Sequence, residues 1–169
     1  KRFEEASNKL NSLINSFKEK GHDEFLLYAH FLLAELSLEW ATKEEHKSVD
    51  RAREHVLFAV EYATKKNHLP LLVKSSSALA QIEAYDLNFE RAKEILSLVN
   101  AQIAGKNFDF LEQEINFQIR TILEQEKACK LYMSAGDRTN ANKNLENVRE
   151  RILEQAKDYV KEAKNLFNT

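Results

Sequence analysis

Metal binding or acid–base catalysis by this chain would depend on its histidine, cysteine and glutamate side chains. Glu19 and His22 have the Glu-x-x-His spacing that supplies metal ligands in helical bundles. Gly21 lies between them and favours the end of a helix, and the chain has no second copy of the motif. The five histidines are scattered: His22, His30, His46, His55 and His68. We therefore predict no metal site.

The single cysteine, Cys129, lies in an apolar-rich stretch. A nucleophilic cysteine needs a base held close to it, and no nearby pattern supplies one. We therefore interpret Cys129 as a small core residue. One cysteine permits no disulfide within the chain and fits a reducing compartment, so we expect a cytoplasmic protein.

No pattern for nucleotide or phosphate chemistry is present. The chain has only 3 glycines, too few for a glycine-rich phosphate loop. The run Ser75–Ser77 could be a phosphorylation site, but small residues at these positions more simply permit close helix packing. We predict no cofactor and no enzymatic activity.

The charge pattern argues against nucleic acid and membrane partners. The net charge is -2 and the pI about 6.3, without the basic excess of a nucleic-acid binder. Basic and acidic residues alternate after Arg138, as on a solvated helix face. No apolar run approaches the ~18 residues that a membrane span needs.

The elements that must position these side chains are predicted to be helices. With 3 glycines and 1 proline the chain lacks the turns of a β fold. Phe3, Ala6, Leu10, Leu13 and Phe17 illustrate the helical spacing. We predict seven helices, with breaks at 20–23, 43–47, 67–70, 86–88, 105–107 and 135–137, with Ser48 capping the third and Pro70 in the first turn of the fourth. Short connections predict antiparallel neighbours.

A spaced pattern recurs in every second helix. Phe89-x-x-Ala92-x-x-x-Leu96-x-x-Val99 is its best copy, and Ala6, Ala52 and Ala141 hold the small position in the others. Alanine at a crossing point lets two helix backbones approach closely. A helix pair that recurs every 40 or so residues is typical of a solenoid.

The stretch Ser77–Val99 resembles a tetratricopeptide repeat. Leu79 and Ala80 match the first helix of that family's pattern, and Phe89, Ala92 and Leu96 match the second. Glu83 and Leu87 depart from it, because the family prefers an aromatic and a glycine there.

The longer units are similar to the expanded repeats of maltose-regulator-type signal-transduction ATPases. We therefore expect one all-α domain over residues 1–169, an antiparallel helix-pair solenoid with about seven helices. The alternative is another all-α array or bundle. Because the chain begins at Lys1 without methionine, we expect a fragment of a larger protein.

The resemblance implies that the first helix of each pair lines a concave groove. The charged outer face of the last helix suits a solubilising cap on the stack. The candidate partner-binding residues are Tyr28, Phe31, Glu35, Glu39, Lys74, Ser77, Gln81, Tyr85, Asn116 and Arg120. Tyr28 and Phe31 could equally be core residues. The set lacks the Lys/Asn/Arg cluster that clamps a C-terminal carboxylate in some family members.

The function expected from the resemblance is a non-catalytic module that binds a protein or peptide segment in the groove. The alternative is a ligand- or partner-sensing arm of a larger transcription regulator or ATPase, which should have a deep pocket lined by polar groups. A third possibility is a purely structural or oligomerising array.

Overall fold

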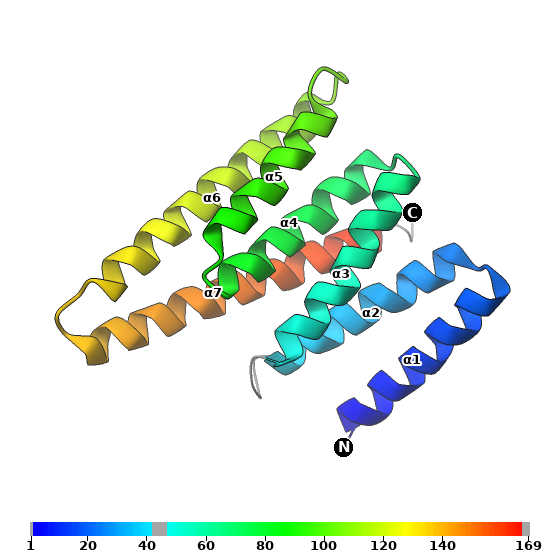
Figure 1. The fold of residues 1–169 in the computed structure, drawn as a ribbon, viewed down its shortest axis with the longest axis horizontal. Helices are drawn as coiled ribbons and strands as arrows, with labels where there is room; N and C mark the ends of the chain where they lie inside the picture. Colours follow the sequence, from blue (N-terminus) through cyan, green and yellow to red (C-terminus); the bar gives the residue numbers. More distant parts are fainter. Residues whose placement is uncertain (1, 42–46, 167–169) are drawn as a thin grey trace.

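The computed structural model describes residues 2–41 and 47–166, and this part of the chain is all-α, without strands. It forms seven helices (Figure 1): α1 Arg2–Lys20, α2 Asp23–Ala41, α3 Lys47–Lys65, α4 Leu69–Tyr85, α5 Phe89–Ile103, α6 Asp109–Met133 and α7 Arg138–Asn165. The prediction of an all-α chain with seven helices is confirmed. The tetratricopeptide-like solenoid stays a prediction.

Local signals account for most of the helix ends. Gly21 has φ +68°, the left-handed conformation that glycine adopts at low cost after a helix. Pro70 lies in the first turn of α4, where its missing N–H costs nothing. The Asp137 carboxylate accepts hydrogen bonds from the backbone N–H groups of Thr139 and Asn140 and so caps α7.

The start of α3 differs from the prediction. Ser48 was expected to cap this helix, but Lys47 is already helical, which places Ser48 in the first turn. The rest of the predicted charged connection, residues 43–46, lies outside the described residues.

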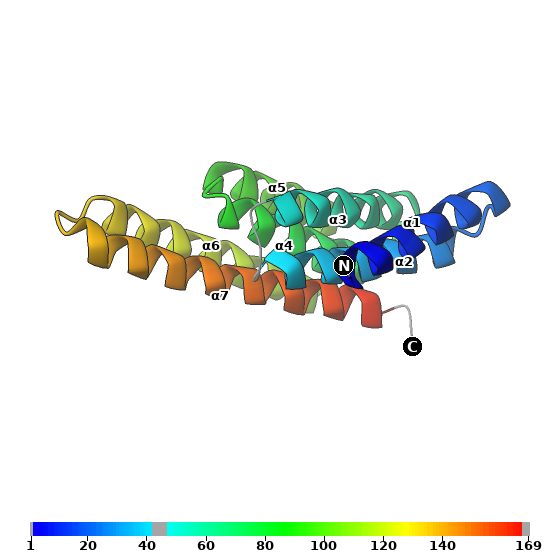
Figure 2. The same cartoon turned by 90° about the horizontal axis from the view of Figure 1, so that it is seen from below.

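The helices form a layered array with α4 at its centre. Each helix packs against the next one along the chain, and α4 also contacts α6 and α7. In the edge-on view of Figure 2, α3 and α5 lie on one side, α2, α4 and α6 lie in the middle, and α7 runs along the opposite side. Nearly every residue of α4 is buried, as its central position requires.

The core contains most of the small residues predicted at helix crossings. Ala52 and Ala92 are fully buried, Ala141 is buried, and Ala6 is only partly buried. Cys129 is buried, which confirms its interpretation as a core residue. The alanine pattern therefore marks close packing in the middle of the array better than at its first helix.

The last helix is not placed as expected. We expected it to cap the end of the stack, but α7 crosses the array and packs mainly against α4, with further contacts to α2 and α6. Its apolar residues form part of the same core: Val148, Ile152, Leu153, Ala156, Val160 and Ala163. The α7 helix therefore lies against α2, α4 and α6, the helices that were predicted to line the groove.

Candidate functional site

The candidate site is the surface of α2, α4 and α6 on which α7 lies. Eight residues on this surface bind α7 or one another beneath it: Glu35, Glu39, Lys74, Gln81, Tyr85, Glu114, Gln118 and Gln125. We call this surface the α2–α4–α6 face. Five of the eight are residues that the sequence predicted to bind a partner.

Two ion pairs hold α7 to α2. The ammonium group of Lys164 pairs with the Glu35 carboxylate. Seven residues earlier, Lys157 Nζ lies 3.4 Å from Glu39 Oε1. A spacing of seven residues is two helical turns, so both lysines project from the same side of α7. Both lysine side chains are largely buried, but Glu39 is mostly exposed, so water screens the Lys157–Glu39 pair more than the Lys164–Glu35 pair.

Lys74 is the central charged group of the face. Its ammonium pairs with Glu114 on α6, lies 2.6 Å from Glu162 Oε2 on α7, and sits 5.7 Å from the centre of the Tyr159 ring. Burial alone would lower the pKa of Lys74, but the hydrogen bonds to the two carboxylates outweigh burial and raise it. Lys74 therefore stays charged and joins α4, α6 and α7.

A chain of hydrogen bonds runs across the same three helices. Gln125 Nε2 donates to Gln155 Oε1 on α7 at 2.7 Å and to Gln81 Oε1 on α4 at 3.0 Å. Gln81 Nε2 donates to Gln118 Oε1 at 3.5 Å, and Gln118 donates to the Tyr159 hydroxyl. A buried amide costs free energy when left unpaired, so this network specifies how α7 sits on the face.

Two tyrosines complete the contact. The Tyr85 ring lies 5.8 Å from the guanidinium carbon of Arg149 on α7. Burial raises the pKa of Tyr85, while Arg149 opposes that shift. Burial, and then the nearby Glu114 carboxylate, raises the pKa of Tyr159 far above its ordinary value. Both phenols stay neutral and serve packing and hydrogen bonding rather than acid–base chemistry.

The other predicted residues lie elsewhere. Phe31 and Ser77 are buried, and Tyr28 is half-buried, so the open question about Phe31 resolves as core. Asn116 and Arg120 are exposed, and each follows a face residue, Glu114 or Gln118, by two positions. Two residues correspond to about 200° around a helix, so both point away from α7.

Several contact residues were missed by sequence reasoning, although signals for them exist. Gln118 interrupts the apolar spacing of α6, and a polar residue inside a buried stripe needs a partner. On α7, Ala156-Lys157 recurs as Ala163-Lys164 seven residues later. Both alanines are buried, which lets the α7 backbone approach the face closely.

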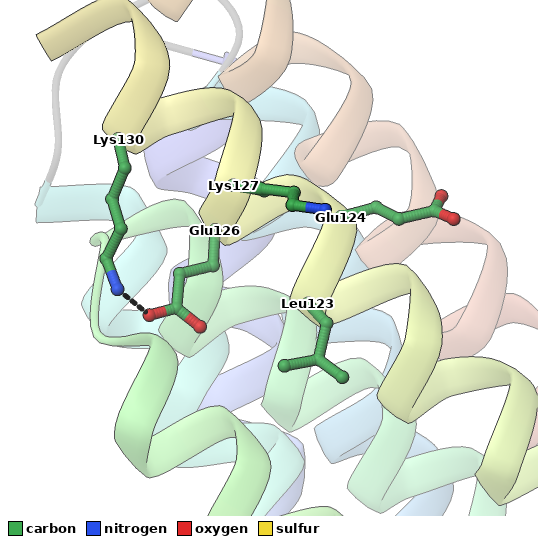
Figure 3. Close-up of a pocket in the computed structure, with 5 residues that line it drawn as sticks. All are labelled: Leu123, Glu124, Glu126, Lys127 and Lys130. Atoms are coloured by element: carbon green, nitrogen blue, oxygen red, sulfur yellow. Dashed lines mark hydrogen bonds and ion pairs between the residues drawn. The ribbon is translucent and has the colours of Figure 1, made fainter. Parts of the chain in front are cut away.

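Two of the hollows along α6 differ in which helices line them. One, of about 390 Å³, is lined by α6 alone through Leu123, Glu124, Glu126, Lys127 and Lys130, and within it Glu126 pairs with Lys130 (Figure 3). The other, of about 290 Å³, lies between α6 and α7 and is lined by Thr121, Glu124, Gln125, Ala128, Val148, Arg151 and Gln155. Only the second is shared by two helices.

In the described part of the chain, no three His, Cys, Asp or Glu side chains are grouped so that they could share a metal ion. None of the helices described combines the length and apolar character of a membrane span. Comparisons with protein-family models, with curated proteins and with solved structures find no match.

Proposed function

We propose that this chain is a non-catalytic, tetratricopeptide-like interaction module whose α2–α4–α6 face binds a helical segment of a partner protein in the cytoplasm. The observation that carries the proposal is that α7 lies along this face. A helix fits there with matched charges and paired amides, which is the helix-in-groove mode of peptide recognition. The α7 helix is then the built-in occupant of the site.

The contacts of α7 define the chemistry of the partner. Its docked side carries two small residues seven apart, Ala156 and Ala163, each followed by a lysine. Those lysines meet Glu35 and Glu39, and Glu162 meets Lys74. A partner helix with small residues and lysines at this spacing would form the same contacts.

Such a partner would have to displace α7. A tethered helix has an effective concentration near its site on the order of millimolar, so a free helix must bind better or arrive when α7 is weakened. The exchange replaces one set of contacts by another, and only their difference in free energy shifts the population. We therefore expect weak binding to the intact chain and stronger binding when α7 is loosened.

The test uses the α7 helix itself as the probe. A fluorescent peptide of residues 138–165 is titrated with the intact chain and with the variant Lys157→Glu/Lys164→Glu, and anisotropy reports binding. In the variant, the two introduced glutamates face Glu39 and Glu35, and the repulsion between these carboxylates loosens its own α7. We expect it to bind the peptide about tenfold more tightly, since ~1.4 kcal/mol corresponds to a factor of ten.

The matched control is Lys143→Glu/Lys161→Glu, which makes the same charge change at exposed α7 positions. It should bind the peptide as weakly as the unmodified chain. Equal binding by both double variants, or no binding by either, would contradict the proposal.

The hollow between α6 and α7 favours the sensing arm as the second candidate function. Most of its lining is polar, and a small ligand there would touch both helices and bias the position of α7. Native mass spectrometry of the purified chain would then show a bound small molecule that is lost in Gln155→Leu. A chain that carries no added mass, even from a cell extract, would argue against this alternative.

A further inference from the structure

The outward side of α6 carries large apolar side chains at heptad spacing. Phe110, Phe117 and Leu131 are 72%, 64% and 65% exposed, and they lie seven and fourteen residues apart. Residues seven apart drift by only about 20° around a helix, so they line one side. We call this line the α6 seam: Phe110, Gln113, Phe117, Arg120, Glu124, Lys127 and Leu131.

The seam lies at the edge of the array. In Figure 1, α6 lies at the upper left border, and no described helix lies beyond it. The contacts of α6 go to α4, α5 and α7, all on its other side. A run of exposed aromatic and aliphatic side chains along an edge helix is typical of an interaction surface.

The charges within the seam select the partner. Arg120 and Glu124 are both exposed and lie one turn apart near the middle of α6. A second α6 in the parallel direction would place arginine beside arginine and glutamate beside glutamate. In the antiparallel direction, the Arg120 of each copy faces the Glu124 of the other, which gives two symmetric ion pairs.

The apolar residues fit the same arrangement. With Arg120 opposite Glu124, the Gln113 position of one helix faces Leu131 of the other, which brings Phe110 close to that leucine. Phe117 then faces Lys127, whose aliphatic stem can cover the ring while its ammonium stays in water.

We propose that this chain forms a two-fold dimer in which the α6 seam packs antiparallel to the same seam of a second copy. At 1.5 Å per residue, α6 is about 37 Å long, so one helix from each copy buries an area at the low end for stable interfaces. We expect the dimer to form at micromolar concentrations. Its α6 residues differ from those of the α2–α4–α6 face, Glu114, Gln118 and Gln125, so the two proposals stand independently.

Sedimentation equilibrium over a range of about 1–200 µM tests the dimer. The unmodified chain should shift from its 19.6 kDa monomer mass towards twice that value. Phe117→Glu should keep the monomer mass throughout, with an unchanged circular dichroism spectrum. The control Phe25→Glu alters a phenylalanine of 62% exposure on α2 and should dimerise like the unmodified chain.

Charge reversal tests the direction of pairing. Arg120→Glu alone and Glu124→Arg alone each place like charges across the seam and should weaken the dimer about tenfold or more. The double variant Arg120→Glu/Glu124→Arg restores opposite charges and should dimerise like the unmodified chain. A monomer at every concentration would overturn the proposal and assign the seam to a different protein. The proposal would also be overturned if Phe117→Glu dimerised like the unmodified chain, or if the double variant dimerised more weakly than either single variant.

Discussion

His30 on α2 and His55 on α3 form a close pair that links the first helices of the array. Their Nδ1 atoms are 3.0 Å apart, and the His30 ring stacks on Phe58 with ring centres 4.0 Å apart. One ring must donate and the other accept, so the two rings cannot both be protonated in this arrangement. Burial, and then the charges of His55 and of Lys18 on α1, lowers the pKa of His30 to about 4, and burial lowers the pKa of His55.

This pair predicts a loss of stability at mildly acidic pH. In the unfolded chain His30 titrates near its ordinary value of 6.5, so the unfolded state binds more protons than the folded one between about pH 6.5 and 4. The stabilising contribution is complete above pH 6.5 and is lost as the pH falls towards 4. We expect about 1–2 kcal/mol from His30, reduced from the full linkage value because the ring is partly open to solvent.

Urea unfolding at several pH values measures the effect. Because carboxylates also titrate in this range, the comparison is with His30→Phe, which keeps the stacking on Phe58 but cannot be protonated. Its unfolding free energy should change less than that of the unmodified chain between pH 6.5 and 4. Parallel curves for the two proteins would contradict the assignment.

At the residue scale, sequence reasoning located the face where repeat landmarks exist. In α4 the resemblance over Ser77–Val99 set the register, and Lys74, Gln81 and Tyr85 do share one face. In α6 no landmark set the register, and Arg120 is on the far side from α7. The pairing of that face with α7 depends on tertiary contacts that no local pattern encodes.

At the scale of elements, helix existence was predictable and the placement of α7 was not. The breaks near Gly21, Pro70 and Asp137 encode helix ends locally. The apolar stripe of α7 could have been buried either by adding to the end of a stack or by folding back across it. Its buried alanines and the lysines beside them favour the second arrangement.

The crossing alanine of α5 gives a test of helix packing. Ala92 is fully buried, so Ala92→Leu must force neighbouring side chains apart, and we expect a loss of about 1–3 kcal/mol of unfolding free energy. Thermal unfolding measures it as a lowered Tm. Ala101→Leu, at an exposed position of the same helix, should leave the Tm nearly unchanged. Equal Tm values for both variants would count against Ala92 as a crossing point.

At the scale of the whole molecule, α7 changes how the array holds together. In a stack of helix pairs, each unit contacts only its neighbours. Here one helix contacts α2, α4 and α6, which lie far apart in sequence. Arg53 on α3 adds a local link by pairing with Glu83 at 2.8 Å and with Asp86 after α4. Without α7, each helix pair would contact only the next pair, whereas α7 spans the array and covers the α2–α4–α6 face.

Native-state hydrogen exchange decides most directly whether α7 is an exchangeable occupant of the α2–α4–α6 face. We expect the amides of residues 152–163 to open together at a lower free energy than those of residues 75–84 in α4. Lys157→Glu/Lys164→Glu should lower the α7 value further and leave α4 unchanged. The contradicting result is that the amides of α7 and α4 exchange only in one common unfolding event, at one free energy. That result would show that α7 is inseparable from the core and that the face is not available to a partner.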